Sequence, residues 1–508
     1  WEEFEQVQQR FLAGEFPKDM VGQFRSMLDY FGQAPIIVRS SSLLEGSFGS
    51  AFAGKYRSEF CANQGHPDER LEAFMRAVKL VYASALNPAV LSYRRRRGLV
   101  ESEEQMAILV QRVSGRLYRH FFFPALAGVA LSRNLYVWTE RIDPRKGIIR
   151  LVFGLGTRAV ERVGVDYPKM IPVGNPLLRP EVGMQVARYS QRLLDLIDLR
   201  ANRFATYRLG DVIETDYPDL YLFVSEVREG GLYDPIARYI QVPIQDLVLT
   251  FNNLVSRTGF VTVMGEMLGI LEDVYGHPVE IEFTASPTAD GCVRVNLLQC
   301  RPMWISRISE EICFPAEMPQ ERVLFRSSRF IGGGAVERIR YIIYIDPERY
   351  TAIDRMGVKK SVGRIVGQIN ARLRDVGRML IMGPGRFGSS NVNLGVNVSY
   401  TDIDNAGVLV EVALEEAGQV PEVSYGTHFF QDLVEGQIIY IPVYPDDRSA
   451  EFNREFFERA PNSLQAFVSD AEGLDEVVRV IDVCAATGGR YANVVADPHS
   501  RRALCFLT

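Results

Sequence analysis

Residues 279–302 restrict the fold of this chain more than any other stretch. Two apolar segments, 279–283 and 293–302, flank a polar segment that contains Asp290 and Gly291. Alternation with a period of two is typical of β-strands, and an Asp-Gly pair between two such segments is a strong hairpin signal. The sequence therefore predicts a two-stranded antiparallel ribbon.

The predicted ribbon carries an unusual set of polar side chains. Glu280 and Glu282 share a face of the first strand, and Gln299 and Arg301 share a face of the second. Carboxylates hold divalent metal ions and a guanidinium holds phosphate, so the set suits a metal–nucleotide site. An edge hairpin with a solvated polar face and one cross-strand ion pair has the same spacing, and the residues alone leave both interpretations open.

Length and composition narrow the class of protein. A chain of 508 residues is expected to hold about two to four domains. The net charge of −6 argues against a general nucleic-acid binder, which needs a basic surface. The six cysteines follow no metal-binding spacing, which favours a reducing, cytoplasmic setting. The most apolar run, residues 121–131, is too short to span a bilayer, so no membrane partner is expected. Because the sequence begins with Trp1 and not with Met, the question of a removed leader segment stays open.

A second candidate site follows a short buried strand at residues 35–38. Arg39 stands at the exit of this strand, and a loop dense in glycine and serine follows at residues 45–54. Backbone N–H groups of such a loop can turn toward an anion, and the arginine would add a bidentate phosphate contact. A plain surface loop is the alternative. The small residues singled out in this loop are Ser47, Gly49 and Gly54.

Together the two stretches resemble the nucleotide-binding domain of the pyruvate-phosphate dikinase and phosphoenolpyruvate synthase family. That family has an acidic "IEW" strand followed by "LQxRP", which appear here as Ile281-Glu282-Phe283 and Leu298-Gln299-Cys300-Arg301-Pro302. Its "VRSSA" strand appears here as Val38-Arg39-Ser40-Ser41-Ser42. The resemblance covers the chain from the strand before Arg39 to Pro302.

The resemblance implies an ATP-grasp fold that binds ATP and Mg²⁺. In such a site Glu282 and Gln299 would coordinate the metal ion, with Glu280 as a third candidate ligand. Arg39 and Arg301 would hold the phosphates during catalysis. The loop with Ser47, Gly49 and Gly54 would fold over the nucleotide.

Gln111 is a further candidate for the nucleotide site. It belongs to a predicted buried strand, residues 106–113, that resembles the family's "VxVQxMV". The resemblance implies that Gln111 lies in the adenine pocket, and a glutamine on an edge strand is the alternative.

Three departures from the family pattern are visible. Thr157 stands where the family's "GLGE" loop has its glutamate. The family's "GGKxxxL" segment, whose lysine also binds phosphate, does not precede Arg39. Either it lies upstream of Trp1 or the site works without it. No stretch of these 508 residues has the eight βα units of the family's phosphoenolpyruvate/pyruvate barrel.

The middle of the chain is less informative. Residues 175–255 match no family motif, and the periodicity of residues 186–197 predicts a helix within an inserted subdomain. Helical periodicity returns at residues 260–275. After residue 303 we expect a linker, residues 304–330, and then a second domain with strands at 341–345 and 379–382.

The second domain offers two candidate groups. Arg386 lies in a Gly-rich loop, residues 383–390, that either grips a phosphate or forms a plain Gly-Pro turn. His428 lies between a glycine turn and an aromatic pair, and a neutral imidazole is a competent phosphoryl acceptor. The family's "TGGxxSHA" carries its phosphohistidine in a swivelling domain at this point, but only Gly-Thr-His-Phe matches, so a half-buried structural histidine is equally compatible.

The sequence therefore predicts a mixed α/β fold. An ATP-grasp domain, with subdomains at residues 1–110 and 111–303, is followed by a smaller β/β/α phosphohistidine-like domain at 331–508. The expected activity is transfer of phosphate from ATP, through His428, to an unidentified small-molecule or protein acceptor. A direct ATP-grasp kinase or ligase and a non-catalytic nucleotide-binding module are the alternatives. Whether the chain forms homo-oligomers or joins further subunits stays open.

Overall fold

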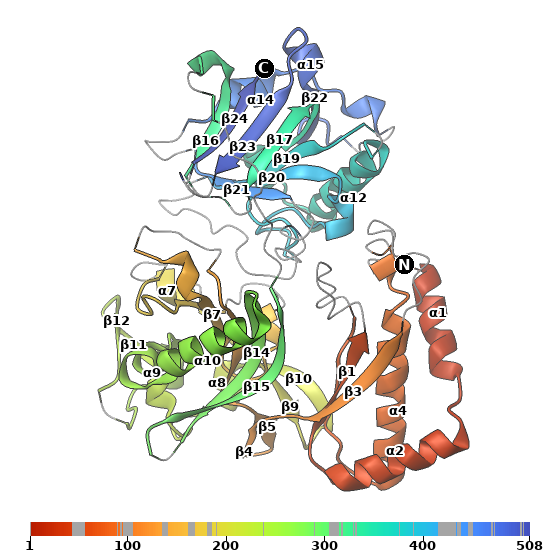
Figure 1. Ribbon diagram of the computed structural model, residues 1–508, viewed down its shortest axis with the longest axis vertical. Coiled ribbons are helices and arrows are strands. Elements are labelled where there is room, and N and C mark those ends of the chain that lie inside the picture. The colour runs from red at the N-terminus through yellow and green to blue at the C-terminus, as the bar shows by residue number, and fades with distance from the viewer. Residues whose placement is uncertain are drawn as a thin grey trace. The chain divides into compact units, whose positions relative to one another are not determined.

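The structure is a computed structural model (Figure 1). It describes residues 2–42, 56–88, 90, 91, 94, 105–134, 141–160, 168–179, 185–188, 190–236, 238–288, 290–303, 314, 315, 318–328, 330, 333–374, 376–389, 391–414, 433, 438–445, 451–468, 471, 473–497, 500 and 502–508.

The chain divides into two compact units. The first comprises Trp1–Asn134 and Thr139–Trp304, and the second comprises Leu135–Trp138 and Ile305–Thr508. Mixed helices and sheets build both units, which confirms the predicted α/β class. No helix among the described residues combines the length and the apolar character needed to cross a bilayer.

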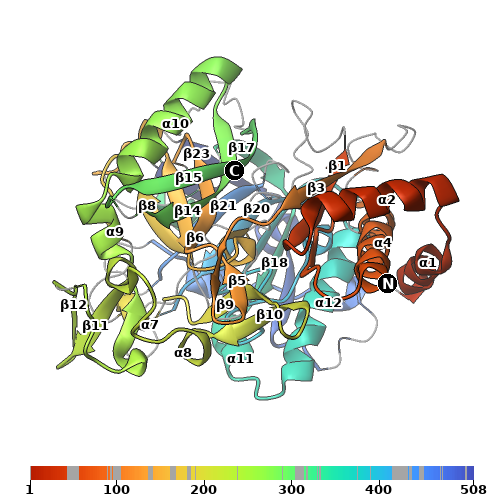
Figure 2. The same cartoon turned by 90° about the horizontal axis from the view of Figure 1, so that it is seen from below.

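The N-terminal part of the first unit is a small sheet backed by helices. The sheet has the order β2-β1-β3, and both views place α1, α2 and α4 together beside it (Figure 1 and Figure 2). His66 caps α4 by accepting from the backbone N–H of Asp68, and Glu69 completes the capping box. The elements are α1 (Glu2–Ala13), α2 (Lys18–Phe31), β1 (Ile36–Ser42), β2 (Glu59–Cys61), α4 (Pro67–Ser84) and β3 (Met106–Arg112).

A five-stranded antiparallel sheet contains the predicted ribbon. Its order is β15-β14-β6-β7-β8, and α10 packs against β14 and β6. The ribbon is longer than the sequence indicates, because β14 continues through residues 284–287, which were expected in the turn. Gly291, with φ +82°, lies in the turn itself. The elements are β6 (Leu126–Leu131), β7 (Ile148–Val152), β8 (Lys169–Pro172), α10 (Phe260–Tyr275), β14 (Val279–Pro287) and β15 (Val293–Pro302).

The stretch expected as an inserted subdomain contributes to two further sheets. The prediction of a helix over residues 186–197 was wrong for most of its length. Among the described residues of this stretch only Gln185–Arg188 is helical (α7), whereas Leu193–Asp198 forms β9. Paired apolar residues at 193–194 and 196–197 mimic helical spacing, but β9 is buried between β5 and β10. The elements are β4 (Arg116–Tyr118), β5 (Phe121–Phe123), β10 (Arg203–Arg208), α8 (Leu209–Val212), β11 (Val224–Arg228), β12 (Gly231–Tyr233), β13 (Leu247–Leu249) and α9 (Asn252–Arg257).

Apolar packing joins the N-terminal sheet to the rest of the first unit. Ala62 and Val113 share a buried cluster with Leu155 and Ile197. The rings of Phe60 and Phe204 stack beside it, with centroids 5.3 Å apart. Desolvated contacts of this kind resist separation, so β1 is held at a defined place relative to the large sheet.

The described residues of the second unit form two sheets and one long helix. One sheet has the order β21-β20-β19-β18-β22, in which β18 to β21 run parallel, and the other is antiparallel with the order β16-β24-β23-β17. They pack face to face through a common core. The antiparallel sheet covers one face of the parallel strands, so the β18–α12–β19 crossover takes α12 to the other face.

This β/β/α layering has the architecture predicted for the second unit. Residues 323–327 were expected in a linker but form β16. Their backbone pairs with β24, and their apolar side chains enter the core. The elements are β16 (Val323–Ser327), β17 (Gly334–Ile339), β18 (Tyr341–Ile345), α11 (Pro347–Thr351), α12 (Met356–Arg372), β19 (Met379–Pro384), β20 (Ala406–Val412), β21 (Ile439–Val443), α14 (Arg454–Arg459), β22 (Val478–Asp482), α15 (Val483–Ala486), β23 (Ala492–Asp497) and β24 (Arg502–Leu507).

We predict that Phe283→Ala destabilises the first unit. Phe283 is 1% exposed in the core of the large sheet, with its ring centroid 6.0 Å from that of Phe260. Removing a buried phenyl ring costs about 3–5 kcal/mol. Urea unfolding followed by circular dichroism measures this loss. Tyr30→Ala is the control, because Tyr30 is 79% exposed and its loss should cost no more than about 0.5 kcal/mol. Equal losses in both variants would contradict the core assignment.

Candidate nucleotide site

Arg39 reaches the ribbon from a strand far away in the sequence. Its Nη2 atom donates to Oε2 of Glu282 and to Oε1 of Gln299, and each distance is 2.7 Å. The side chains of Arg39 and Glu282 are 18% and 24% exposed. The structure therefore brings together three of the residues predicted for the nucleotide site. Their roles toward nucleotide and metal stay predictions.

A second ion pair lies beside the first on the same ribbon. Nη2 of Arg301 donates to Oε1 of Glu280 over 2.9 Å, and these side chains are only 12% and 8% exposed. Such a buried pair is not a stability device by itself, since desolvation offsets much of the attraction. It does hold the Arg301 guanidinium in one orientation. The predicted cross-strand ion pair thus exists, and it uses the carboxylate of the third candidate metal ligand.

A β-bulge decides that all four ribbon residues share one face. Phe283 pairs with Leu297, but the register shifts at this point, so that Glu282 pairs with Gln299 and Leu298 is the extra residue. A one-residue shift moves every following side chain to the opposite face. Without the bulge, Gln299 would lie opposite Ile281 on the apolar face. The bulge therefore assembles the polar cluster.

The sheet that carries Arg39 presents an accessible face around it. Leu109 lies directly opposite Arg39 on β3 and is 44% exposed, although it is apolar. Gln111 lies opposite Ile37, so it is on the same face as Arg39 and is half-buried. This position is compatible with the predicted place of Gln111 beside a nucleotide.

A carboxylate from another strand lies beside the loop that contains Thr157, the residue at the glutamate position of the "GLGE" motif. The Thr157 hydroxyl donates to Oδ2 of Asp195 on β9 over 2.6 Å. Arg158 Nε and the Thr206 hydroxyl donate to Oδ1 over 3.0 and 2.6 Å. Asp195 is 4% exposed and has three donors, which is typical of a structural anchor. Sequence reasoning missed it, and an aspartate inside the apolar run 193–197 was the available signal.

Cys300 adjoins Gln299 on β15 without adding charge to the site. Burial raises the pKa of the Cys300 thiol, and a hydrogen bond from Tyr275 only partly opposes this shift. The nearby Cys300 sulfur, together with burial, raises the pKa of Tyr275. Both groups are therefore neutral near pH 7.

The Gly-rich loop of the second unit is not an anion-binding loop as it stands. The backbone N–H groups of Arg386 and Gly388 donate to the carbonyls of Leu394 and Val396. The N–H of Phe387 donates to the carboxylate of Glu411. Since the Arg386 side chain is only 2% exposed, the described geometry favours the structural turn over the phosphate-gripping interpretation.

Four predicted residues lie outside the described part of the chain. They are Ser47, Gly49 and Gly54 of the predicted lid and His428.

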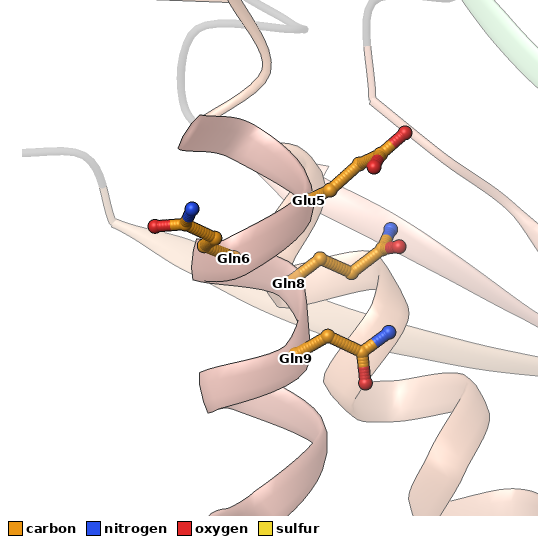
Figure 3. A pocket seen from close by; sticks show the side chains of 4 residues that line it. All are labelled: Glu5, Gln6, Gln8 and Gln9. Atoms are coloured by element: carbon orange, nitrogen blue, oxygen red, sulfur yellow. The ribbon is translucent and has the colours of Figure 1, made fainter. Parts of the chain in front are cut away.

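The described surface also has a hollow that does not resemble a nucleotide site. About 550 Å³ of space is lined by Glu5, Gln6, Gln8 and Gln9 of α1 (Figure 3). One carboxylate and three amides on a single helix include no basic group that would hold a phosphate. We assign it no role.

The donor set on the ribbon fits Mg²⁺. Among the described residues, no group of three or more His, Cys, Asp and Glu side chains is arranged to hold a metal ion. Mg²⁺ needs fewer protein ligands, because it keeps several waters and shares the phosphates of its substrate. The oxygens of Glu282 and Gln299 already converge on one cationic atom, Nη2 of Arg39. This pair is therefore the candidate metal site.

Comparison with known proteins agrees with this geometry. The family described as "Pyruvate phosphate dikinase, AMP/ATP-binding domain" matches residues 2–315, which is more than half of the chain and includes both β1 and the ribbon. The chain belongs to this family. No curated protein matches it significantly. The matched range also includes residues 175–255, which hold none of the motifs recognised in the sequence.

We predict that Cys300 resists alkylation at neutral pH. The thiolate is the reacting species, and burial raises the pKa of Cys300 and so lowers its thiolate fraction. Cys292 is the internal control, since it is exposed in the turn of the same ribbon. Iodoacetamide labelling followed by peptide mass analysis should therefore modify Cys292 first. Equal rates would show that Cys300 is more accessible or more ionised than its surroundings imply.

Proposed function

We propose that this protein is an ATP- and Mg²⁺-dependent phosphotransferase of the dikinase type. One observation carries the proposal. Arg39, Glu282 and Gln299, from segments more than 240 residues apart, meet within hydrogen-bond distance, with two contacts of 2.7 Å. They stand at the motif positions of a family whose matched domain binds AMP or ATP.

The proposed roles follow from charge and reach. Arg39 and Arg301 bind the phosphates, because a guanidinium can donate two parallel hydrogen bonds to phosphate oxygens. Glu280 keeps Arg301 oriented through their buried ion pair. Glu282 and Gln299 would hold Mg²⁺, which neutralises charge on the transferred phosphoryl group when it is bound. Gln111 would lie beside the base, on the same face as Arg39.

His428 is the proposed phosphoryl acceptor. A ring nitrogen of His428 would form a bond to the β-phosphorus of ATP as the bond from that phosphorus to the bridging oxygen of the α-phosphate breaks, so that AMP leaves with this oxygen. Water would then take the γ-phosphoryl group as phosphate, and the β-phosphoryl group would stay on the imidazole. The resemblance to the dikinases implies AMP and phosphate as final products, with the second acceptor taking the group from the imidazole. The acceptor is a small molecule or protein that is not identified.

One observation favours a second candidate function. Thr157 replaces the family's glutamate, and its hydroxyl is engaged by Asp195, so the loop presents no carboxylate of its own. A site altered in this way could serve direct transfer without a phosphohistidine, or nucleotide binding without turnover. Direct transfer would release ADP instead of AMP, and a binding module would release neither product.

We predict that Glu282→Gln and Arg301→Ala each lower ATP turnover by a factor of about 10²–10³, as loss of one preorganised charge contact typically does. Initial rates of AMP or ADP release measure this. Glu266→Gln is the control. Glu266 is exposed on α10, and its substitution removes the same charge as Glu282→Gln. Wild-type rates in both site variants, with circular dichroism unchanged, would remove these residues from the site.

We predict that the protein retains label from ATP on a histidine. Incubation with [β-³²P]ATP and, separately, [γ-³²P]ATP should give an acid-labile adduct from one of the two, since phosphohistidine hydrolyses in acid. His428→Ala should abolish the adduct, whereas His499→Ala should retain it. A label that survives His428→Ala would assign the acceptor to another residue, and the absence of any adduct together with ADP release would favour direct transfer.

A further inference from the structure

The Arg39 guanidinium holds both oxygens that the proposed function assigns to the metal ion. A terminal guanidinium nitrogen carries two hydrogens, and Nη2 directs one to Glu282 and the other to Gln299. Nε and Nη1 of Arg39 make no hydrogen bond within the described part of the chain. The three side chains thus form a closed unit in which one cationic atom satisfies two acceptors.

A metal ion and this guanidinium compete for the same place. Mg²⁺ binds its oxygen ligands at about 2.0–2.1 Å. Since the oxygens of Glu282 and Gln299 already meet around Nη2, an ion bound to both would have to displace that atom. Like charges at such short range also repel strongly in a site that is only partly exposed to water.

Displacement by free metal leaves Arg39 without an anionic partner. Its side chain is 18% exposed, so most of it cannot regain full hydration without moving. Nucleotide phosphates change this balance, because they offer the guanidinium new acceptors of high charge. Metal that arrives with phosphate therefore exchanges one ion pair for another.

We propose that Arg39 excludes free divalent metal from Glu282 and Gln299, and that metal enters this pair only together with the phosphates of a nucleotide. The inference rests on the proposed function, because it takes these two residues as metal ligands. Arg39 is then both a phosphate-binding residue and the group that orders ligand entry. By thermodynamic reciprocity, metal and nucleotide must each strengthen the binding of the other.

The test measures metal binding with and without a nucleotide. Mn²⁺ replaces Mg²⁺ so that electron paramagnetic resonance reports bound metal directly, and a non-hydrolysable ATP analogue supplies the phosphates. Wild-type protein should bind Mn²⁺ alone weakly and Mn²⁺ with the analogue tightly. Arg39→Ala should bind Mn²⁺ alone about tenfold tighter than wild type, since it loses the competing charge-assisted contact. The same variant should bind Mn²⁺ with the analogue more weakly than wild type. Opposite changes in the two arms are the signature.

Matched variants separate this effect from charge and folding. Arg25→Ala removes the same charge from an exposed ion pair with Asp68 and should leave both affinities unchanged. Adding Glu282→Gln to Arg39→Ala should abolish the gain in Mn²⁺ affinity. Arg39→Met, which keeps the aliphatic length of the side chain, replaces Arg39→Ala if circular dichroism shows the latter to be unfolded.

The outcomes distinguish the inference from the proposed function. Unchanged Mn²⁺ affinity in the folded Arg39 variant overturns the inference and leaves the proposed function intact. Equal binding of Mn²⁺ to wild-type protein with and without the analogue also overturns the inference and leaves the proposed function intact. Wild-type protein that binds no analogue at all overturns the proposed function, and this is seen before any variant is compared.

Discussion

The candidate site of the first unit depends on one interaction, in which the Arg39 guanidinium donates hydrogen bonds to both Glu282 and Gln299. Its partners lie 243 and 260 residues away in the sequence, on a ribbon that belongs to a different sheet. Charge-assisted hydrogen bonds contribute about 1.5–3 kcal/mol each, which is small beside the cost of ordering two distant segments. The contact therefore cannot assemble the unit by itself, and a stronger interaction must bring the two segments together.

Apolar packing is that stronger interaction. The cluster of Ala62, Val113, Leu155 and Ile197, with the stacked rings of Phe60 and Phe204, fixes the N-terminal sheet against the strands that follow. The ribbon is fixed separately, because both β14 and α10 bury side chains in the main core of the unit. Burial is non-directional and holds the two elements in place, while the charged contacts give the site its specificity.

The ribbon shows how a small irregularity acquires a functional consequence. The bulge at Leu298 adds one residue to β15, and this brings Gln299 and Arg301 to the face that already carries Glu280 and Glu282. Two arginine–glutamate pairs then stand side by side, and they differ in exposure. The Arg301–Glu280 pair is nearly buried and rigid, whereas the Arg39–Glu282 pair is more accessible and links two sheets. The accessible pair is the one suited to exchange partners with a ligand.

In the second unit, the apolar strands that build the core decide the fold, and the polar residues take the positions that this packing leaves. Arg386 and Glu411 are buried beside the end of the parallel sheet, and the loop that holds Arg386 uses its own N–H groups internally. A glycine-rich sequence is thus compatible with two opposite outcomes. Only the packing around the loop separates an anion-binding loop from a self-satisfied turn.

The sequence by itself determined the ribbon, its turn at Asp290-Gly291, the helices α1, α2 and α10, and the four polar residues that define the ribbon, because alternation and helical spacing are local properties. It also carried the family motifs. The tertiary structure alone decided that Arg39 meets Glu282 and Gln299, that Asp195 fills the place beside Thr157, and that residues 193–198 form a strand instead of a helix. Those outcomes depend on register, on a bulge and on partners distant in the chain, and no local pattern encodes which distant acceptor a guanidinium will reach.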